Sequence, residues 1–233
     1  SAQDFVETGT PGVRTTKTGV LSRATAKLGG TSVTKAVALA PNRPVSFMGP
    51  DPVLVALSLE DFAFAPVPWK DEAAGPLAAM YEGNEAGATV GCILDALKVL
   101  RTTPALIAGP SNGAVYPDAP FGQSMSHAAQ IVKASVGARC IFVHGFGVFD
   151  THSSQLEHHA TDFVSLGGAL AAFDQDIGSL RDNVVVLVTT EFGRTVLANG
   201  SAGTDHGSGY CALVMGGGVK GGRMHGEWKG LSK

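Results

Sequence analysis

The sequence predicts an α/β fold with three layers (α/β/α), in which helices cover both faces of a largely parallel sheet. Three apolar runs in the second half of the chain have the length and composition of buried strands: RCIFVHGF, NVVVLVTTEF and YCALVMGGG. Residues 155–180, between the first two runs, have the apolar periodicity of a long helix. Continuous apolar strands that alternate with helices are typical of parallel sheets, so these two observations predict the fold class.

The first half of the chain supplies further helices and one more strand. Apolar spacing predicts a short helix over residues 19–29, and a run rich in Val and Ala predicts a strand over residues 34–40. Residues 71–102 have helical periodicity that is interrupted near Gly83, which predicts two helices or one kinked helix against a sheet face. Residues 120–137 predict another helix.

The whole chain, residues 1–233, is expected to form a single domain. It is 44% hydrophobic and 16% charged, which suffices for a sizeable core, and no internal repeat or low-complexity linker divides it. Residues 44–69 contain five prolines, so residues 41–70 are interpreted as strand fragments and loops that form a flap or insertion. The chain opens without the strand that usually begins an α/β domain, which indicates a fragment.

Charge and hydropathy argue against two classes of partner. The formal net charge is −3 and no dense Lys/Arg cluster is present, so nucleic acid and anionic membranes are not expected partners. No apolar run approaches the roughly 20 residues that span a bilayer, so no membrane span is expected. Cys92, Cys140 and Cys211, odd in number and widely spaced, are predicted to be buried free thiols.

Carboxylates and imidazoles flank the three predicted strands of the second half. They follow the first and second strands and precede the third. In open α/β sheets ligands bind beyond the carboxyl ends of the strands, so these side chains are expected to meet in one crevice. Carboxylate oxygens and imidazole nitrogens together suit a divalent cation such as Zn, Mn, Mg or Ca. The predicted metal ligands are Asp150, His152, Glu191, Asp205 and His206.

Arg194 is the candidate catalytic residue. It lies close after Glu191 in the chain, and a guanidinium can form two parallel hydrogen bonds with a phosphate or sulfate group. The glycines beside these groups, Gly193, Gly203 and Gly207, allow tight turns and would leave the site open to a small anionic ester.

Each motif also has an ordinary structural interpretation. Asp150 or Ser153 could cap the helix that follows them. The TTEFGRT segment could be a strand end with a surface ion pair, and GTDHG could be a turn. The metal hypothesis therefore depends on all three segments lying beside consecutive strands, where a common crevice is expected.

Other function classes have less support. The chain contains neither the G-x-S-x-G elbow of serine hydrolases nor the spacing of a phosphate-binding loop. A carbohydrate- or polymer-binding module would rest only on a few aromatic side chains, which are more often core or lid residues. They are Trp69, Tyr81, Tyr116 and Trp228.

Several motifs taken together resemble a known family. The motifs, which span the chain from end to end, are AQDFVETGTPG, FDTHSSQ, VVVLVTTEFGRTV, NGSAGTDHGSG and GGGVKGG. In this order they resemble the sulfatase-like family of unknown function that usually carries a twin-arginine export signal, within the alkaline phosphatase superfamily. The resemblance is weakest between residues 35 and 101.

The resemblance implies an alkaline-phosphatase-like α/β/α fold with one or two metal ions at the strand ends. In that superfamily an Asp and a His after one strand, an acidic residue after the next and a later His bind the metal. The matching residues are Asp150, His152, Glu191 and His206, with Asp205 beside the last as a ligand or a supporting group. The Asp-x-His spacing here is shorter than the usual Asp-x-x-x-His.

The resemblance also implies that parts of the fold lie outside this sequence. The superfamily places a further metal-binding Asp and a Ser, Thr or modified Cys nucleophile in its N-terminal region, and nothing in residues 1–233 matches them. The family also continues beyond the C-terminal stretch, so the domain is expected to be incomplete at both ends.

The sequence is therefore compatible with two functions. The leading hypothesis is a metal-dependent hydrolase-like protein that acts on phosphate or sulfate esters. The alternative, motivated by the missing nucleophile, is a non-catalytic exported surface or assembly protein, such as a homo-oligomer, that retains the fold with a structural metal. The family's export signal implies a periplasmic or extracellular location for either.

Overall fold

The computed structural model describes residues 2–59, 72–145, 147–227 and 230. The α-helices are α1 (Ala2–Thr8), α2 (Val20–Leu28), α3 (Ala74–Met80), α4 (Gly87–Thr102), α5 (Pro120–Ala134) and α6 (Gln155–Ile177). The strands are β1 (Ala36–Leu39), β2 (Leu54–Ala56), β3 (Cys140–Val143), β4 (Val185–Val188), β5 (Gly193–Ala198), β6 (Thr204–Gly207) and β7 (Leu213–Gly216). Short 3₁₀ helices are η1 (Val45–Phe47), η2 (Pro104–Leu106) and η3 (Gly178–Asn183).

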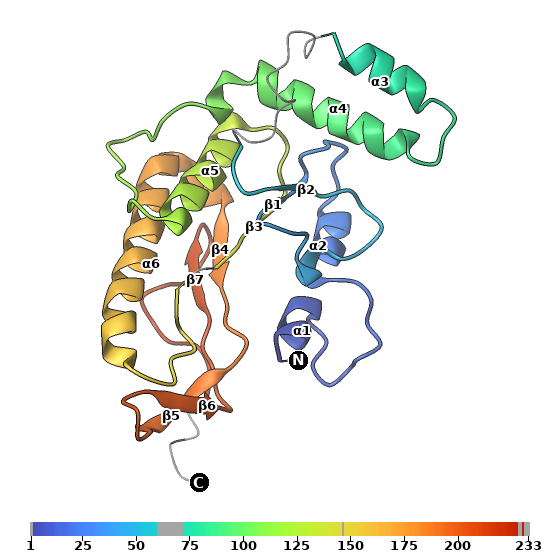
Figure 1. The fold of residues 1–233 in the computed structure, drawn as a ribbon. Coiled ribbons are helices and arrows are strands. Elements are labelled where there is room, and N and C mark those ends of the chain that lie inside the picture. Colours follow the sequence, from blue (N-terminus) through green and yellow to red (C-terminus); the bar gives the residue numbers. More distant parts are fainter. Residues whose placement is uncertain (1, 60–71, 146, 228–229, 231–233) are drawn as a thin grey trace.

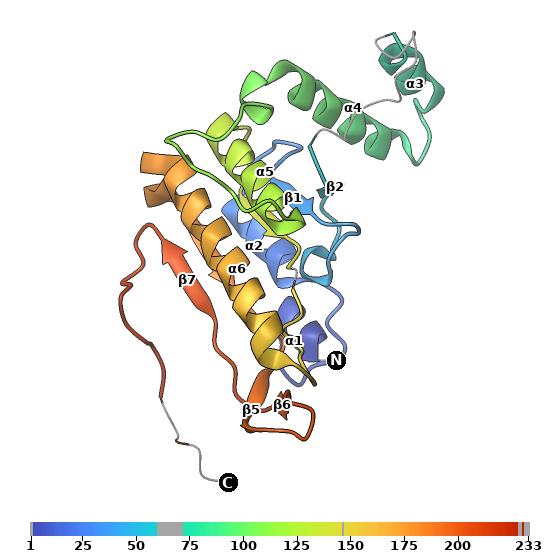
Figure 2. The same ribbon diagram turned by 60° about the vertical axis from the view of Figure 1, so that its left-hand side comes forward.

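A small parallel sheet in the order β2-β1-β3 lies at the centre of the core. All four residues of β1 are buried, which explains why the sequence is apolar at successive positions there. Val37 and Leu39 face a cluster that includes residues of α5 and α6, whereas Ala36 and Ala38 face Phe47 of η1 and partly buried residues beside it. Helical layers therefore cover both faces of this sheet, with α2 on one side and α5 and α6 on the other (Figures 1 and 2). The α/β class is confirmed.

Of the described strands of the second half, only β3 belongs to this parallel sheet. Within the described residues, β4 pairs antiparallel with β7, from Val185 opposite Gly216 to Val188 opposite Leu213. Val185 and Leu187 are 60% and 61% exposed, so the expectation of strands buried on both faces was wrong here. A four-residue apolar run encodes neither its partner nor the direction of pairing, and hydrophobicity alone could not distinguish the two arrangements.

The structure contains a hairpin and a helix that the sequence did not predict. Strands β5 and β6 form an antiparallel pair in segments that had been interpreted as a strand end and a turn. In Figure 1 this hairpin lies at the N-terminal end of α6. Helix α1 lies at the start of the chain, where the sequence predicted no strand and no helix. Glycines and polar residues in the hairpin segments obscured the alternation that indicates strands, and the 7 residues of α1 are too few to show a clear helical period.

Two helices, α3 and α4, lie within residues 72–102, which confirms the interruption expected near Gly83. Within the proposed flap, residues 41–70, strand β2 pairs with β1 and so belongs to the parallel sheet, which agrees with the strand fragments expected there. Residues 60–70 of that flap lie outside the described residues. None of the described helices is long and apolar enough to cross a membrane.

The cysteines are free thiols but are less buried than the sequence suggested. Cys211 is exposed, and Cys92 and Cys140 are half-buried. Their apolar surroundings in the sequence predicted burial, but the segment around Cys211 lies before β7, on a part of the chain that faces outward.

A buried polar cluster joins the segment before α5 to helices α5 and α6. The Asp176 carboxylate, whose side chain is 0% exposed, accepts hydrogen bonds from Lys133 Nζ at 2.6 Å and from the Tyr116 hydroxyl at 2.9 Å. The backbone N–H of Ser111 donates to the same carboxylate at 2.6 Å. Burial, and then the Asp176 carboxylate, raise the pKa of Tyr116 above its ordinary value of 10.0. The cluster satisfies a carboxylate that would otherwise be costly to bury.

Candidate metal centre

Two segments that are distant in sequence run side by side to form the candidate site. One is the loop after β3, residues 147–154, and the other is the β5–β6 hairpin. The backbone N–H of Thr204 donates to the carbonyl of Thr151 at 3.1 Å, and the N–H of Gln155 donates to the carbonyl of Ala202 at 3.0 Å. An isolated bridge between Ser153 and Ala202 continues this pairing. The backbone itself therefore holds the two segments together.

The turn of the hairpin is shaped by an asparagine and a glycine. Asn199 Oδ1 accepts hydrogen bonds from the N–H groups of Ser201 and Gly203, and its Nδ2 donates to the His152 carbonyl at 3.0 Å. A Cβ on Gly203 would lie 2.2 Å from the carbonyl carbon of His152. Only glycine permits this approach of the two backbones.

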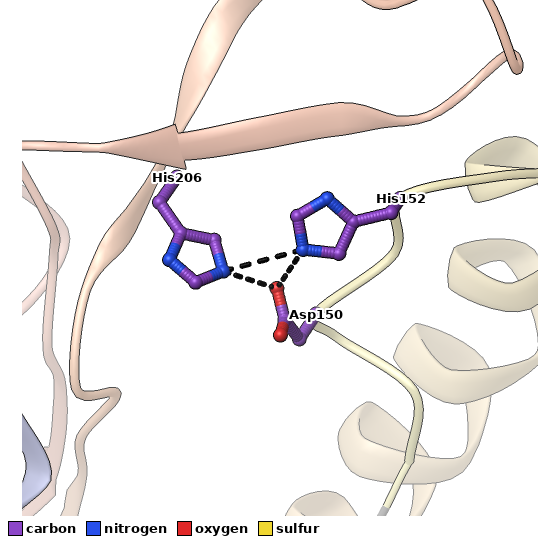
Figure 3. Close-up of side chains that lie close together, drawn as sticks. All are labelled: Asp150, His152 and His206. Atoms are coloured by element: carbon purple, nitrogen blue, oxygen red, sulfur yellow. Dashed lines mark hydrogen bonds and ion pairs between the residues drawn. The ribbon is translucent and has the colours of Figure 1, made fainter.

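Asp150, His152 and His206, here called the metal triad, bring their ligand atoms together (Figure 3). Asp150 Oδ1 lies 3.0 Å from His206 Nε2 and 3.2 Å from His152 Nε2, and the two nitrogens are 3.3 Å apart. Neighbouring ligands of a tetrahedral zinc ion with bonds of 2.0–2.1 Å are separated by about 3.3 Å. The spacing and the donor types of the triad therefore fit a divalent metal ion.

The triad is open to solvent, and neighbouring side chains stabilise the negative charge of Asp150. The side chains are 49%, 51% and 53% exposed for Asp150, His152 and His206. Desolvation is the largest single effect and would raise the pKa of Asp150, but His206, Arg194 and His152 together outweigh it and hold that pKa below its ordinary value. Asp150 is therefore ionised at neutral pH, which is the form that ligates metals.

Asp205 lies on the outer side of His152. Its Oδ1 is 3.3 Å from His152 Nδ1 and also 3.3 Å from the side-chain nitrogen of Asn199. These hydrogen bonds, with that of Asn199 the larger effect, lower the pKa of Asp205. A carboxylate that accepts the Nδ1–H of histidine leaves the Nε2 lone pair for a metal and fixes the orientation of the ring. The structure thus gives Asp205 the position of a supporting group.

Arg194 points into the site rather than outward to a substrate. Its Nε donates to Thr204 Oγ1 at 3.0 Å, its Nη2 donates to the carbonyls of Thr151 and Thr204, and its Nη1 forms an ion pair with Asp150. The side chain is only 17% exposed. In this arrangement the guanidinium ties the loop to the hairpin, and no nitrogen of it is directed at an external anion.

Glu191 and Phe192 lie just before β5. Glu191 is exposed, and among the described residues it is not part of the group whose donor atoms converge. Its assignment as a ligand stays a prediction. The ring of Phe192 stacks on the His206 imidazole with centroids 3.9 Å apart and an interplanar angle of 25°. This contact supports the His206 ring from the face.

Sequence reasoning missed the polar residues that support the triad. Thr151 and Thr204 are 2% and 7% exposed, and both hydroxyls donate to Gln155 Oε1. The Asn199 side chain stabilises the hairpin turn by accepting two backbone hydrogen bonds. The available signal was proximity in sequence, because Thr151 stands between two members of the triad and Thr204 lies just before Asp205 and His206.

The comparison with protein families identifies the chain's relatives. A family model described as a protein of unknown function, DUF1501, matches residues 10–233. The chain belongs to the DUF1501 family. Both segments of the metal triad lie inside the matched region. Neither the curated proteins nor the solved structures contain a match to this DUF1501 chain.

Proposed function

We propose that this chain is a metal-dependent hydrolase-like protein that acts on phosphate or sulfate esters. The observation that carries the proposal is the convergence of Asp150 Oδ1, His152 Nε2 and His206 Nε2. Catalytic zinc sites have three protein ligands and leave a position for water or substrate, whereas structural zinc sites are closed by four ligands. A triad that is half-exposed corresponds to the open, catalytic arrangement.

The types of donor atom in the triad limit which metal ion it would bind. Two imidazoles and one carboxylate suit zinc or manganese better than calcium or magnesium, which take oxygen ligands almost exclusively. A bound ion of this kind polarises an ester oxygen and lowers the pKa of bound water. The protein's own contribution is to hold the three donors at the observed spacing and to keep the site accessible.

Two neighbouring residues would orient and stabilise the metal ligands. Asp205 orients His152 through Nδ1, and Arg194 neutralises part of the charge of Asp150 while it joins the two segments. Because Arg194 is engaged within the protein, recognition of the anionic group would depend on the metal charge itself. This proposal differs from the expectation from sequence, in which the Arg194 guanidinium itself binds the phosphate or sulfate group.

The second candidate function is that of a non-catalytic exported surface or assembly protein with a structural metal. One observation favours it: two hydroxyls beside the triad, those of Thr151 and Thr204, are buried and bonded to Gln155, so neither is presented as a nucleophile. The periplasmic or extracellular location and the sulfatase-like kinship also remain proposals, which rest on the motifs of the sequence.

Metal analysis of the purified protein tests the leading proposal. We expect about one equivalent of zinc or manganese in the wild type and a large loss in Asp150→Ala and His206→Ala. His158→Ala is the matched control, because His158 is an exposed histidine of α6 outside the triad. A wild-type protein that binds no divalent ion would refute the metal centre.

Turnover then separates the two candidate functions. Hydrolysis of 4-nitrophenyl phosphate or 4-nitrophenyl sulfate that needs the metal and is lost in His206→Ala would support the hydrolase. Stoichiometric metal without turnover of either ester would favour the structural role.

A further inference from the structure

Gln155, the first residue of α6, connects the two segments that carry the metal triad. Its Oε1 accepts a hydrogen bond from Thr151 Oγ1 at 3.0 Å and another from Thr204 Oγ1 at 2.5 Å. Thr151 belongs to the loop that carries Asp150 and His152, and Thr204 belongs to β6, which carries His206. A single amide oxygen therefore joins both sides of the site.

The directions of the hydrogen bonds around Gln155 are mutually consistent. Arg194 Nε–H donates to Thr204 Oγ1 at 3.0 Å, so the proton of that hydroxyl is directed to Gln155 Oε1. Thr151 Oγ1 likewise donates to Gln155 and lies 3.3 Å from His159 Nε2, whose N–H can donate to it. Rotating the amide by half a turn would set its N–H₂ against two hydroxyls that already point toward it.

Burial makes this connection energetically important. Thr151 and Thr204 are almost inaccessible, so a hydroxyl that lost its acceptor could not turn to water without disturbing the packing. The geometry of the triad depends on the separation of the same two segments, and its donor atoms are only 3.0–3.3 Å apart. A small shift between the loop and the hairpin would therefore separate the three donor atoms too far to coordinate the same metal ion.

We propose that Gln155 is a positioning residue of the metal centre, whose amide oxygen sets the separation between the loop and the hairpin and thereby the affinity for metal. The inference rests on the proposed function, because it concerns the same triad. Gln155 does not reach the metal ligands themselves in the described contacts; it acts through Thr151 and Thr204. Groups that hydrogen-bond directly to metal ligands commonly change metal affinity 10–100-fold, so we expect the lower end of that range for Gln155, which is one residue further from the metal.

The test measures zinc affinity by competition with a chromophoric chelator and the visible absorption spectrum of the cobalt-substituted protein. Gln155→Leu keeps most of the side-chain volume but removes the acceptor, so we expect zinc affinity to fall about tenfold or more and the cobalt spectrum to change. Gln155→Glu keeps an acceptor oxygen and should bind zinc at least as tightly as the wild type. Gln175→Leu is the matched control at the other end of α6, where Gln175 Nε2 donates to the Asn112 carbonyl at 2.8 Å.

The outcomes separate the inference from the proposed function. Wild-type zinc binding together with unchanged affinity and cobalt spectrum in Gln155→Leu would overturn the positioning role alone. The same loss of affinity in Gln175→Leu would also overturn it, since the effect would then be general. A wild-type protein that binds neither zinc nor manganese would overturn both. If Gln155→Leu does not fold, Thr151→Val and Thr204→Val each remove one of the two bonds, and both should weaken zinc binding.

Discussion

Arg194 and His206 are directly opposite each other in the register of the β5–β6 ladder, and both contact Asp150 Oδ1. The hairpin pairing thus brings a guanidinium and an imidazole from neighbouring strands to one carboxylate oxygen of the loop. Arg194 belongs to the interior of the site because of this register, and its effect should appear first in stability.

Replacing Arg194 by lysine should destabilise the fold although the charge is kept. Lysine cannot reproduce the separate contacts of Nε, Nη1 and Nη2, and the buried carbonyl of Thr204 would lose its donor. We expect the free energy of unfolding to fall by about 2 kcal/mol in urea denaturation. Arg223→Lys, an exposed arginine of the C-terminal segment, should leave it unchanged. Equal stability of Arg194→Lys and the wild type would contradict this role.

Asp205→Asn should weaken metal binding without removing a ligand. The charge that holds the Nδ1–H of His152 is lost, so the Nε2 atom becomes a poorer and less well oriented donor. We expect a roughly tenfold loss of zinc affinity, measured by chelator competition. Asp118→Asn, before α5, is the control. A loss of all bound metal in Asp205→Asn would instead indicate that Asp205 is a direct ligand.

Alkaline conditions should destabilise the protein through Tyr116. Its pKa is raised in the folded state, so the folded protein keeps the phenol neutral while the unfolded chain ionises near the ordinary value of 10.0. The contribution is therefore fully present below pH 10 and is lost as pH rises above it, by at most about 1.4 kcal/mol per pH unit. Unfolding free energies between pH 8 and 11 should show a steeper decline in the wild type than in Tyr116→Phe. Parallel curves would show that Tyr116 does not contribute.

Gly203→Ala should disturb the hairpin and the metal centre together. The added Cβ would meet the backbone of His152 at 2.2 Å, and backbone atoms cannot move aside as a flexible side chain can. We expect a loss of about 1–3 kcal/mol in stability and weaker zinc binding. Gly200→Ala lies in the same turn with no atom within 4 Å of its added Cβ, and it should behave as the wild type. Identical behaviour of both variants would argue against the close approach.

The candidate site was partly predictable because strand ends can be recognised from apolar runs. Asp150, His152 and His206 were expected to meet, and the structure brings them together. The role of Arg194 was not predictable in the same way, because it depends on a strand pairing that opposes Arg194 and His206. Pairing register is set by contacts between segments, which a periodicity within one segment does not encode.

Prediction of the fold from sequence is limited in the same way. Helices with clear apolar spacing, such as α2, α5 and α6, and strands β1 and β3 lie where the sequence predicts them. Strand β4 was also found, but its assignment to the parallel sheet was wrong, because a Val-rich run is equally compatible with the antiparallel ribbon it forms with β7.

The metal triad joins residues that lie 56 positions apart, since Asp150 and His206 come from different segments. During synthesis, Asp150 and His152 are made well before His206, and until then the chain offers only two of the three donors. The chain between Asp150 and His206 must also close into a loop, at a cost in conformational entropy, to bring the third donor to the other two. Binding by all three donors should consequently follow the docking of the hairpin onto the loop, so that an ion held by the complete triad marks a chain in which these two segments have already come together.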